Sequence, residues 1–314
     1  MKFIEIGGNM TDGIFHGRRR GVKFDDYDLI MERAAKVGVE KIIITVGSFR
    51  EFYRAVEICK KYEGKAFMTC GIHPTRSNEI TGDKCDPKYI ERQIDVLRKR
   101  IHKFKEYIVA YGEFGLDYDR LHFSPKTSQL AAFKAQLSLA SELNLPLFLH
   151  TRNAESDFCP LLSSFSFPKK GVVHSFTGTP KERDIVLKLG YDLSVNGCSF
   201  KKEHQLECVK KIPLSRLHLE TDCPWCDIRS SHASWEHVKT KFHFKHVSKA
   251  EPGDMIKGRN EPCCIVQVVE VMSAIMGISA EKIADKCYEN SEKMYFAEKS
   301  SDILPASSAV PEEK

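Results

Sequence analysis

The sequence predicts an α/β protein whose eight parallel β-strands close into a barrel inside a ring of helices, the (β/α)8 or TIM-barrel fold. Two observations favour it. Short apolar runs alternate with helical patterns along most of the 314 residues. Four of the runs also end within a residue or so of a side chain that can bind metal: Glu113, His150, His174 and Asp222. The carboxyl ends of barrel strands share one rim, so these side chains would meet there.

The predicted strands are eight short runs rich in aliphatic and aromatic residues: Phe3–Ile6, Ile42–Val46, Ala66–Gly71, Tyr107–Gly112, Pro146–His150, Gly171–His174, Asp192–Val195 and Leu217–Asp222. An open, doubly wound sheet would have similar content, but it gathers its site at one switch point. Ligand-type residues spread over the fourth, fifth, sixth and eighth strands favour the closed barrel instead.

The predicted helices carry apolar residues at three- and four-residue spacing, and several open with Asp, Ser or Pro, which suit helix starts. They are Asp25–Val37, Phe49–Tyr62, Pro87–Phe104, Pro125–Leu143 and Pro180–Leu189. Each lies between two predicted strands, which is the alternation that a parallel barrel requires.

The chain length and its 42% hydrophobic content fit one large core, so we expect a single barrel domain over residues 1–298. The segment from residue 299 to 314 is rich in Ser, Pro, Ala and charge and lacks an apolar period. This composition predicts a disordered tail that is dispensable for catalysis.

No stretch approaches the apolar length of a membrane span, and the chain starts directly with a strand instead of a basic and apolar leader. Eleven cysteines are spread over the chain, several inside predicted strands or helices, which indicates reduced thiols instead of a disulfide framework. We therefore expect an intracellular protein of the nucleus or cytoplasm. The net charge of +5 permits a nucleic-acid partner without demanding one.

Two imidazoles and two carboxylates converging on one rim match a site for one or two divalent metals, where a bound water becomes a nucleophile near neutral pH. Each residue alone proves little, because a single histidine at a strand end is more often packed or hydrogen-bonded than a ligand. The four together favour a metal site, since each follows directly on apolar residues and needs a polar partner there.

Six motifs strongly resemble the TatD family of metal-dependent deoxyribonucleases, and the likeness extends from the first strand to about Phe296. They are Gly71-Ile72-His73-Pro74, Gly112-Glu113-Phe114-Gly115-Leu116-Asp117, Leu149-His150, His174-Ser175-Phe176-Thr177-Gly178-Thr179, Glu220-Thr221-Asp222-Cys223-Pro224 and Arg259-Asn260-Glu261-Pro262. The run Asp222-Cys223-Pro224-Trp225-Cys226 looks most like the eukaryotic TatD-domain branch.

The resemblance implies a TIM barrel of the metal-dependent hydrolase type that hydrolyses DNA phosphodiesters, with a 3′→5′ exonuclease polarity and a role in DNA repair or apoptotic DNA degradation. It also implies roles for the rim residues. Glu113 would bridge two metals, His150 and His174 would bind one of them, and Asp222 would bind the other and accept a proton from the attacking water. Two ions could then clamp the attacking and leaving oxygens at phosphorus.

The first strand departs from many relatives, which carry Asp-x-His-x-His where this chain has Glu5-Ile6-Gly7-Gly8-Asn9. Both histidines are missing, and an amide, a backbone position and water would replace them. Such oxygen-rich ligands favour Mg²⁺ or Mn²⁺, with Zn²⁺ as the softer alternative. The TatD branch itself looks similar at this stretch. Asn9 is also a candidate contact for the substrate.

Further rim residues have two interpretations each. His73 could touch the scissile phosphate or orient water as a catalytic group, or it could be a structural turn residue. Asp117 and Asp119 could orient the metal ligands through hydrogen bonds, or lie solvated in a turn. Arg152 could neutralise a phosphate oxygen, or pair with a helix carboxylate.

The segment from Pro224 to Asn260 lacks periodicity and mixes cationic with aromatic residues, as an unpaired DNA strand requires of a protein surface. They are Arg229, Lys239, Lys241, Lys245, Lys249, Lys257, Arg259, Trp225, Trp235, Phe242 and Phe244. Alternatively, its aromatic residues cover the outer wall of the barrel. Arg259 is the preferred phosphate contact or loop anchor. We expect single-stranded DNA or frayed ends as the partner, and possible association with other nucleases.

Cys223-Pro224-Trp225-Cys226 fits a redox pair or half of a zinc site, but no second such pair stands at zinc-ribbon spacing and no clear helix follows. Packed thiols are the better interpretation.

Two other functions stay open: hydrolysis of another ester, such as an aminoacyl-tRNA or a small phosphoester, and a nucleic-acid scaffold without chemistry. The four metal-capable residues argue against the scaffold, because binding alone would not require them.

Overall fold

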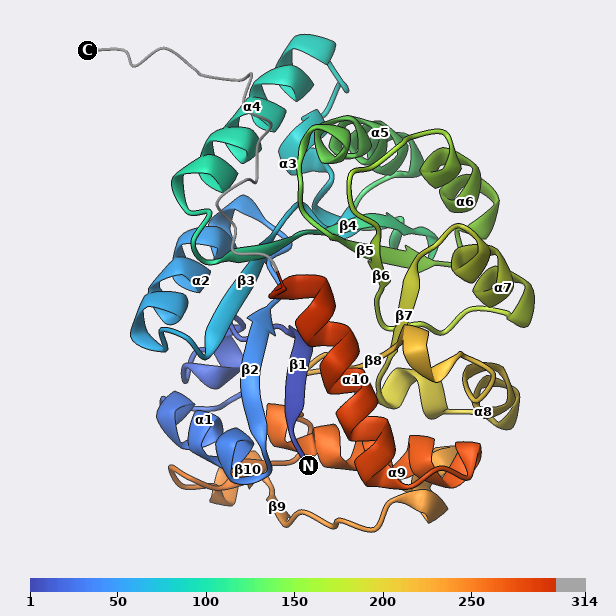
Figure 1. Ribbon diagram of the computed structural model, residues 1–314. Coiled ribbons are helices and arrows are strands. Elements are labelled where there is room, and N and C mark those ends of the chain that lie inside the picture. Colours follow the sequence, from blue (N-terminus) through green and yellow to red (C-terminus); the bar gives the residue numbers. More distant parts are fainter. Residues whose placement is uncertain (298–314) are drawn as a thin grey trace.

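The computed structural model describes residues 1–297, so the predicted tail at 299–314 lies outside the described residues. Eight parallel strands follow one another in chain order around the molecule (Figure 1). They are β1 (Phe3–Gly8), β2 (Val39–Ile44), β3 (Ala66–Cys70), β4 (Ile108–Asp117), β5 (Leu147–Arg152), β6 (Gly171–Val173), β7 (Asp192–Val195) and β8 (Leu217–Leu219).

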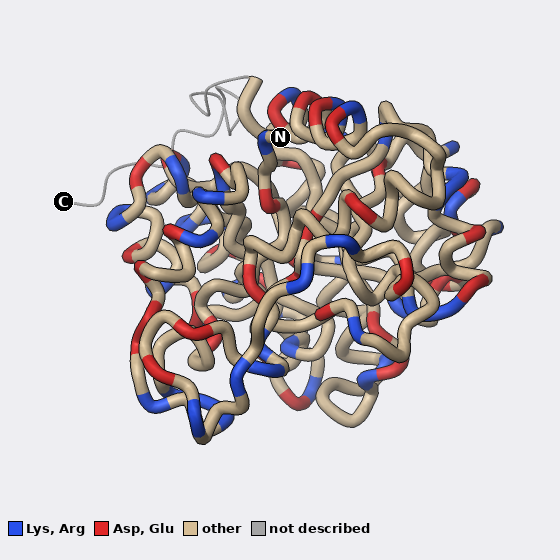
Figure 2. Tube along the Cα trace, turned by 90° about the horizontal axis from the view of Figure 1, so that it is seen from below, with Lys and Arg blue, Asp and Glu red and all other residues tan. Residues whose placement is uncertain are grey.

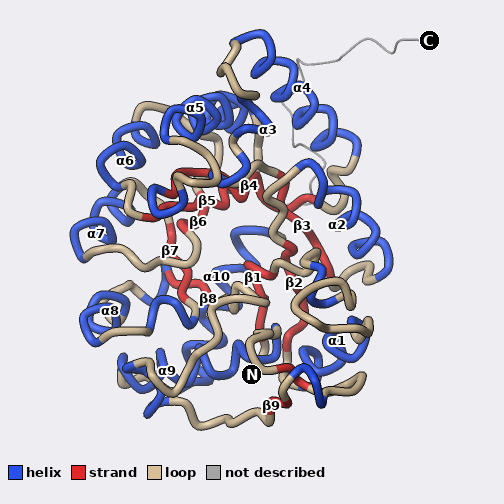
Figure 3. Tube along the Cα trace, turned by 180° about the vertical axis from the view of Figure 1, so that it is seen from behind, coloured by secondary structure: helices blue, strands red, loops and turns tan. Residues whose placement is uncertain are grey.

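The eighth strand returns to the first, as the view from behind in Figure 3 shows. The backbone N–H of Asn9 donates to the carbonyl of Cys223 at 2.7 Å. The Glu5 carboxylate in β1 accepts the N–H of Thr221, just after β8, at 2.8 Å. An open, doubly wound sheet would not place its strands in sequential order. The predicted barrel is therefore confirmed.

Helices surround the strands (Figures 1 and 3). They are α1 (Tyr27–Lys36), α2 (Phe49–Lys61), α3 (Asn78–Thr81), α4 (Pro87–Lys103), α5 (Lys126–Glu142), α6 (Glu155–Ser163), α7 (Pro180–Lys188), α8 (Glu203–Val209), α9 (Ile265–Met276) and α10 (Ala280–Tyr295). All five predicted helices are present within two residues at each end. Side-chain caps explain several starts: Ser48 accepts the N–H of Glu51, and Thr179 accepts that of Glu182.

Two strand ends, those of β4 and β8, differ from the prediction in ways that matter for the rim. β4 continues five residues further, to Asp117, because Gly115 keeps it paired with β5 at His150. A Cβ at Gly115 would overlap the carbonyl oxygen of His150, and its φ of +152° suits only glycine. β8 instead stops at Leu219, so Asp222 lies on the following turn.

The segment between β8 and α9 runs past α1 and α9 and contains two short strands, β9 (Phe244–Lys245) and β10 (Met255–Ile256) (Figure 1). Positive and negative residues are interspersed over the face seen in Figure 2, which agrees with the small net charge. No single helix in residues 1–297 is long and apolar enough to span a membrane. One pair, Pro262–Met276 with Ala280–Tyr295, passes by length and composition but is bent by 114°.

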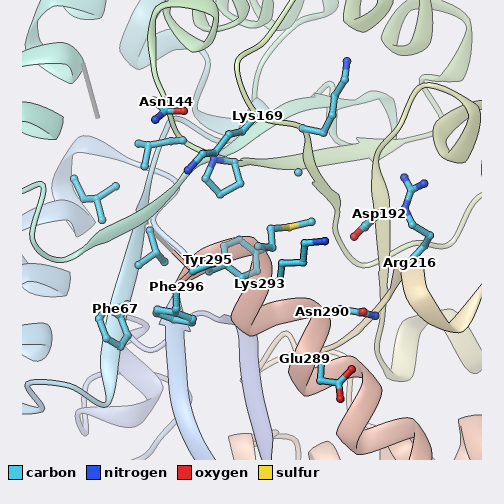
Figure 4. Close-up of a pocket in the computed structure, with 18 of the residues that line it drawn as sticks. Phe67, Asn144, Lys169, Asp192, Arg216, Glu289, Asn290, Lys293, Tyr295 and Phe296 are labelled. Carbon is cyan, nitrogen blue, oxygen red and sulfur yellow. Dashed lines mark hydrogen bonds and ion pairs between the residues drawn. The ribbon is translucent and has the colours of Figure 1, made fainter. Parts of the chain in front are cut away.

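A cavity of about 1550 Å³ opens at the amino ends of the strands, the mouth opposite the predicted rim. Figure 4 shows Phe67 from β3, Tyr295 from the end of α10 and Phe296 directly after it around this cavity, with Asp192 facing Arg216. Asp192 and Arg216 form an ion pair. In barrels of this class the chemistry sits at the carboxyl ends. This cavity at the amino ends of the strands is therefore not the candidate active site.

Candidate metal centre

Three imidazoles surround one carboxylate oxygen at the carboxyl ends of the strands. Glu113 Oε1 lies 2.7 Å from His174 Nε2, 2.9 Å from His150 Nδ1 and 3.3 Å from His73 Nε2. The two ring nitrogens of His150 and His174 are 3.2 Å apart. Residues from β3 to β6 thus meet at one point, as the barrel predicts.

The donor set fits a metal ion. Ligand atoms of Glu113, His150 and His174 all lie within 4.8 Å of one another, and so do those of His73, Asp117 and His150. Metal–ligand bonds of roughly 2.0–2.2 Å place neighbouring ligand atoms about 3.0–3.5 Å apart, close to the spacing seen here. Imidazole nitrogen and carboxylate oxygen together suit divalent transition metals, and the carboxylates also suit Mg²⁺ and Mn²⁺.

Charge distribution at this site also favours a cation. Burial opposes ionisation of Glu113, but the charges of His174 and His73 outweigh it and hold its pKa well below the usual value. Burial likewise lowers the pKa of His174, but Glu113 and Glu220 outweigh it and the pKa is raised well above the usual value. The His174 imidazole thus holds a proton where a cation would otherwise neutralise Glu113, and metal binding would release that proton.

His73 is a structural turn residue, as one of its two interpretations predicts, and its ring also faces the centre; its catalytic role stays a prediction. Its Nδ1 accepts the N–H of Thr75 at 3.1 Å and caps the 3-10 turn Pro74–Arg76, while its Nε2 faces Glu113. Its ring meets that of His150 edge-on, with centroids 4.6 Å apart. Burial lowers the pKa of His73, although Glu113 opposes this.

Asp117 orients His150, as predicted. Its Oδ2 lies 3.3 Å from His150 Nε2, and its Oδ1 accepts the N–H of Asp119. A carboxylate on the second nitrogen fixes the ring and its tautomer. Asp119 is exposed and its Oδ1 accepts from Asn153 instead, so only the solvated alternative applies to it.

Asp222 lies on the turn after β8, with a φ of +52°. Asn9 Nδ2 donates to its Oδ1 at 2.8 Å, and the Cys226 thiol lies 3.2 Å from its Oδ2. Burial raises the pKa of Asp222 to about 7, while the charge of His174 lowers it. Asp222 belongs to neither of the two tight ligand groups, but it lies beside them, since the charges of His174 and Glu113 act on its carboxyl.

Sequence reasoning missed the role of Glu220, which is fully buried behind His174. Its Oε1 accepts from the N–H of Ser175 at 2.7 Å and from Asn196 Nδ2 at 3.0 Å, and lies 3.6 Å from His174 Nδ1. Its Oε2 lies against Gly7, so a Cβ there would overlap it. Glu220 thus lies between His174 and Gly7 of β1, the strand in which the two histidines of many relatives are missing, and it positions His174 from there. The sequence did carry a signal for this role, because an acidic residue that directly follows the apolar residues of a strand needs a buried polar partner.

Arg152 ends β5 and is half-buried. Within residues 1–297 it makes no ion pair, so the predicted pairing with a helix carboxylate is absent there. Its charge acts on the rim: burial opposes ionisation of Asp117, but His150 lowers the pKa of Asp117 and Arg152 lowers it further. Arg152 therefore keeps its guanidinium available for a phosphate oxygen.

Arg259 is not a phosphate contact. It is fully buried, and its guanidinium holds both Asp26 oxygens at 2.7 and 2.8 Å and Glu261 at 3.0 Å. These contacts fasten the long loop to the start of α1. The prediction of substrate contact is thus wrong and its alternative, a loop anchor, holds, because the cation is neutralised inside the protein.

The aromatic residues of the same loop divide between the two predicted alternatives. Trp235 and Phe242 pack against the core, as outer-wall residues would, and Lys241 Nζ lies 3.6 Å from the Trp235 ring centroid. Trp225, three residues after Asp222, instead lies under two arginines: the guanidinium carbons of Arg19 and Arg20 are 5.2 and 4.5 Å from its ring centroid. Phe244 is exposed, so Trp225 and Phe244 are the aromatic residues that stay available for the predicted stacking of bases.

All eleven cysteines are free, including Cys223 and Cys226. Cys223 is fully buried and its thiol contacts Met10, which agrees with the predicted packed thiols and excludes direct pairing with Cys226 in this structure. Cys226 contacts Cys198 from the end of β7 instead.

Comparison with known proteins gives the same picture as the geometry. The model of the TatD-related DNase family matches residues 16–296. A protein named Deoxyribonuclease Tat-D from Schizosaccharomyces pombe is 41% identical over 297 residues, covering 93% of this chain and 95% of its own. A 3′-5′ ssDNA/RNA exonuclease TatD from Erwinia billingiae is 30% identical, covering 93% and 98%. The crystal structure of a TatD family hydrolase from Entamoeba histolytica is 37% identical, with a TM-score of 0.87 over 95% and 99% of the two chains.

Proposed function

The chain belongs to the family of TatD-related DNases, and from this premise we propose that it is a divalent-metal-dependent deoxyribonuclease that removes nucleotides from the 3′ end of single-stranded or frayed DNA. The observation that carries the metal dependence is the meeting of three imidazoles on Glu113. The polarity and the single-stranded substrate are supported by the name of the bacterial relative.

Glu113, His150 and His174 would hold one ion, and Asp222 with Glu113 the other. Bound there, divalent cations supply Lewis acidity that polarises the phosphoryl oxygen and lowers the pKa of water. The oxygen donors at Asn9 and Asp222 favour Mg²⁺ or Mn²⁺ at the second position.

The protein's own groups prepare the substrate for in-line attack. Arg152 would bind a non-bridging phosphate oxygen through its fork of donors. Asp222 would take up a proton at Oδ2, since burial brings its pKa to about 7, where a carboxylate can accept and release protons at neutral pH. Asn9 holds the other oxygen of Asp222 and so fixes the direction from which it acts.

A single experiment separates this function from its alternatives. Single-stranded DNA labelled at either end, aminoacyl-tRNA and a chromogenic phosphodiester are incubated with the enzyme in Mg²⁺, Mn²⁺ or a chelator. We expect metal-dependent loss of nucleotides from the 3′ end and, for Glu113→Gln, a rate reduced about 100-fold or more. The matched control is Asp119→Asn, which changes an exposed acid of the same segment whose side chain contacts Asn153 and none of the metal-binding residues.

Full activity in chelator would refute the metal dependence. Cleavage of the aminoacyl ester but not of DNA would replace the proposed substrate.

We further propose a reducing compartment, nucleus or cytoplasm, which the eleven free cysteines support. Roles in DNA repair or apoptotic degradation and association with other nucleases stay predictions.

A further inference from the structure

Two thiols from different strand ends meet beside the metal centre. Cys198 lies in the 3-10 turn Gly197–Phe200 after β7, and Cys226 lies on the loop after β8. Their Sγ atoms are 2.7 Å apart, and Cys226 Sγ also lies 3.2 Å from Asp222 Oδ2. We propose that this pair is an oxidative modification site, at which a hydroperoxide converts the two thiols into a reversible Cys198–Cys226 disulfide.

The backbone brings the two thiols together independently of their side-chain rotamers. A Cβ at Gly197 would overlap the carbonyl oxygen of Cys226, so the two segments touch directly before Cys198. Asn196 Oδ1 accepts the N–H of Cys198 at 2.8 Å, and Asn260 Nδ2 donates to the carbonyl of Trp225 at 2.7 Å. Each cysteine is thus held on a fixed turn.

The remaining movement is small. A disulfide needs an S–S distance of about 2.05 Å, so the two sulfurs, now 2.7 Å apart, must approach each other by only about 0.65 Å. Cys226 lies on a rim loop and is half-buried, and Cys198 keeps 8% of its surface exposed. The pair is therefore not sealed in the core, and a molecule as small as hydrogen peroxide can approach it through the exposed part of Cys226.

The surroundings distinguish the attacking thiol from the resolving one. The hydrogen bond from Cys226 lowers the pKa of Cys198; burial opposes this, and the charges of Lys201 and Arg152 lower it further. The Cys198 thiolate attacks one peroxide oxygen, the O–O bond breaks, and sulfenic acid and hydroxide form. Cys226 then attacks the sulfenic sulfur, the S–O bond breaks and water leaves. Two thiols and one hydrogen peroxide give one disulfide and two waters.

This inference goes beyond the proposed function, because the oxidation does not require nuclease activity. It does affect the same site, since a disulfide has no S–H to donate to Asp222. It would also link the ends of β7 and β8 covalently at the rim.

The test uses the reduced full-length protein treated with a small molar excess of hydrogen peroxide, then alkylated and digested without reductant. We expect a linked peptide pair containing Cys198 and Cys226, and a fall in thiols of the denatured protein from eleven to nine, reversed by dithiothreitol. Cys198→Ser should lose the linked pair and keep its remaining thiols. Cys85→Ser, which removes another half-buried thiol, should form the pair as wild type does.

The proposal is overturned if the thiols stay at eleven, or if oxidation links other cysteines, such as the adjacent Cys263 and Cys264, in place of this pair. The peptide map of the wild-type protein decides the question even if a variant fails to fold.

Discussion

Arg259→Ala should destabilise the protein strongly without acting on DNA binding, because Arg259 neutralises two buried carboxylates. The side chains of Asp26 and Glu261 are both fully buried, and Arg259 forms an ion pair with each of them. Removing one partner of a buried ion pair costs about 3–5 kcal/mol, since the other charge stays buried without compensation.

The structure places the expected loss at the lower end of that range. Arg33 remains 2.8 Å from Glu261 and 3.9 Å from Asp26, so part of the compensation survives. A loss of about 3 kcal/mol changes the unfolding equilibrium more than 100-fold. With a denaturant dependence of roughly 3 kcal/mol per molar urea, the unfolding midpoint should fall by about 1 M.

The loss should also depend on pH. Burial raises the pKa of Glu261, while Arg259 and Arg33 oppose this. Without Arg259 the pKa should rise further, so acid would neutralise the orphaned carboxyl. The difference in unfolding free energy between wild type and variant should therefore shrink from pH 8 to pH 5.

Urea unfolding followed by circular dichroism measures this, alongside the affinity of the folded variant for single-stranded DNA. Arg98→Ala is the control: Arg98 is one-third exposed, pairs with Glu142 on the surface, and should change stability by about 0–1 kcal/mol. A variant of unchanged stability with weakened DNA affinity would refute the anchoring role.

Three further outcomes follow from the same structure. Arg152→Ala should weaken binding of single-stranded DNA. The slope of the logarithm of the binding constant against the logarithm of salt concentration should become less steep by about 0.7. In the same fluorescence titration, Arg98→Ala should leave both the affinity and the slope unchanged. Gly115→Ala should destabilise the fold by about 3 kcal/mol or more in thermal unfolding, because its Cβ would overlap a backbone oxygen at an unfavourable φ; a small loss would contradict this geometry. Burial raises the pKa of Glu5 from 4.5 to about 8, so the stability that its neutral form contributes is complete below pH 4.5 and lost as pH rises towards 8. Glu5→Gln should therefore lose less unfolding free energy than wild type between pH 5 and pH 8, and equal losses would speak against it.

The barrel could be predicted because the spacing of apolar residues and the order of strands and helices can both be recognised in short stretches of sequence. All eight strands and five helices follow from apolar spacing, and the rim position of Glu113, His150 and His174 follows from where those strands end. The convergence of these residues needed no knowledge of side-chain rotamers, since parallel strands direct their carboxyl ends to one rim.

Contacts between distant segments were beyond such reasoning. Nothing in the run around Arg259 reveals that Asp26, more than 200 positions earlier, lies within reach of its guanidinium. A buried arginine and a phosphate-binding arginine look alike in sequence, because burial is decided by the fold. The same holds for Glu220, whose partners Ser175 and Asn196 come from other strands.

The opposite mouth of the barrel has a practical consequence. Its cavity is lined by the amino ends of the strands, while Glu113 lies in the second half of β4 and Asp222 lies beyond the carboxyl end of β8, with the packed barrel interior between them. An inhibitor designed for that cavity would not meet the polynucleotide, so excess substrate could not displace it. Competition with substrate would therefore distinguish a ligand of the rim from a ligand of this cavity.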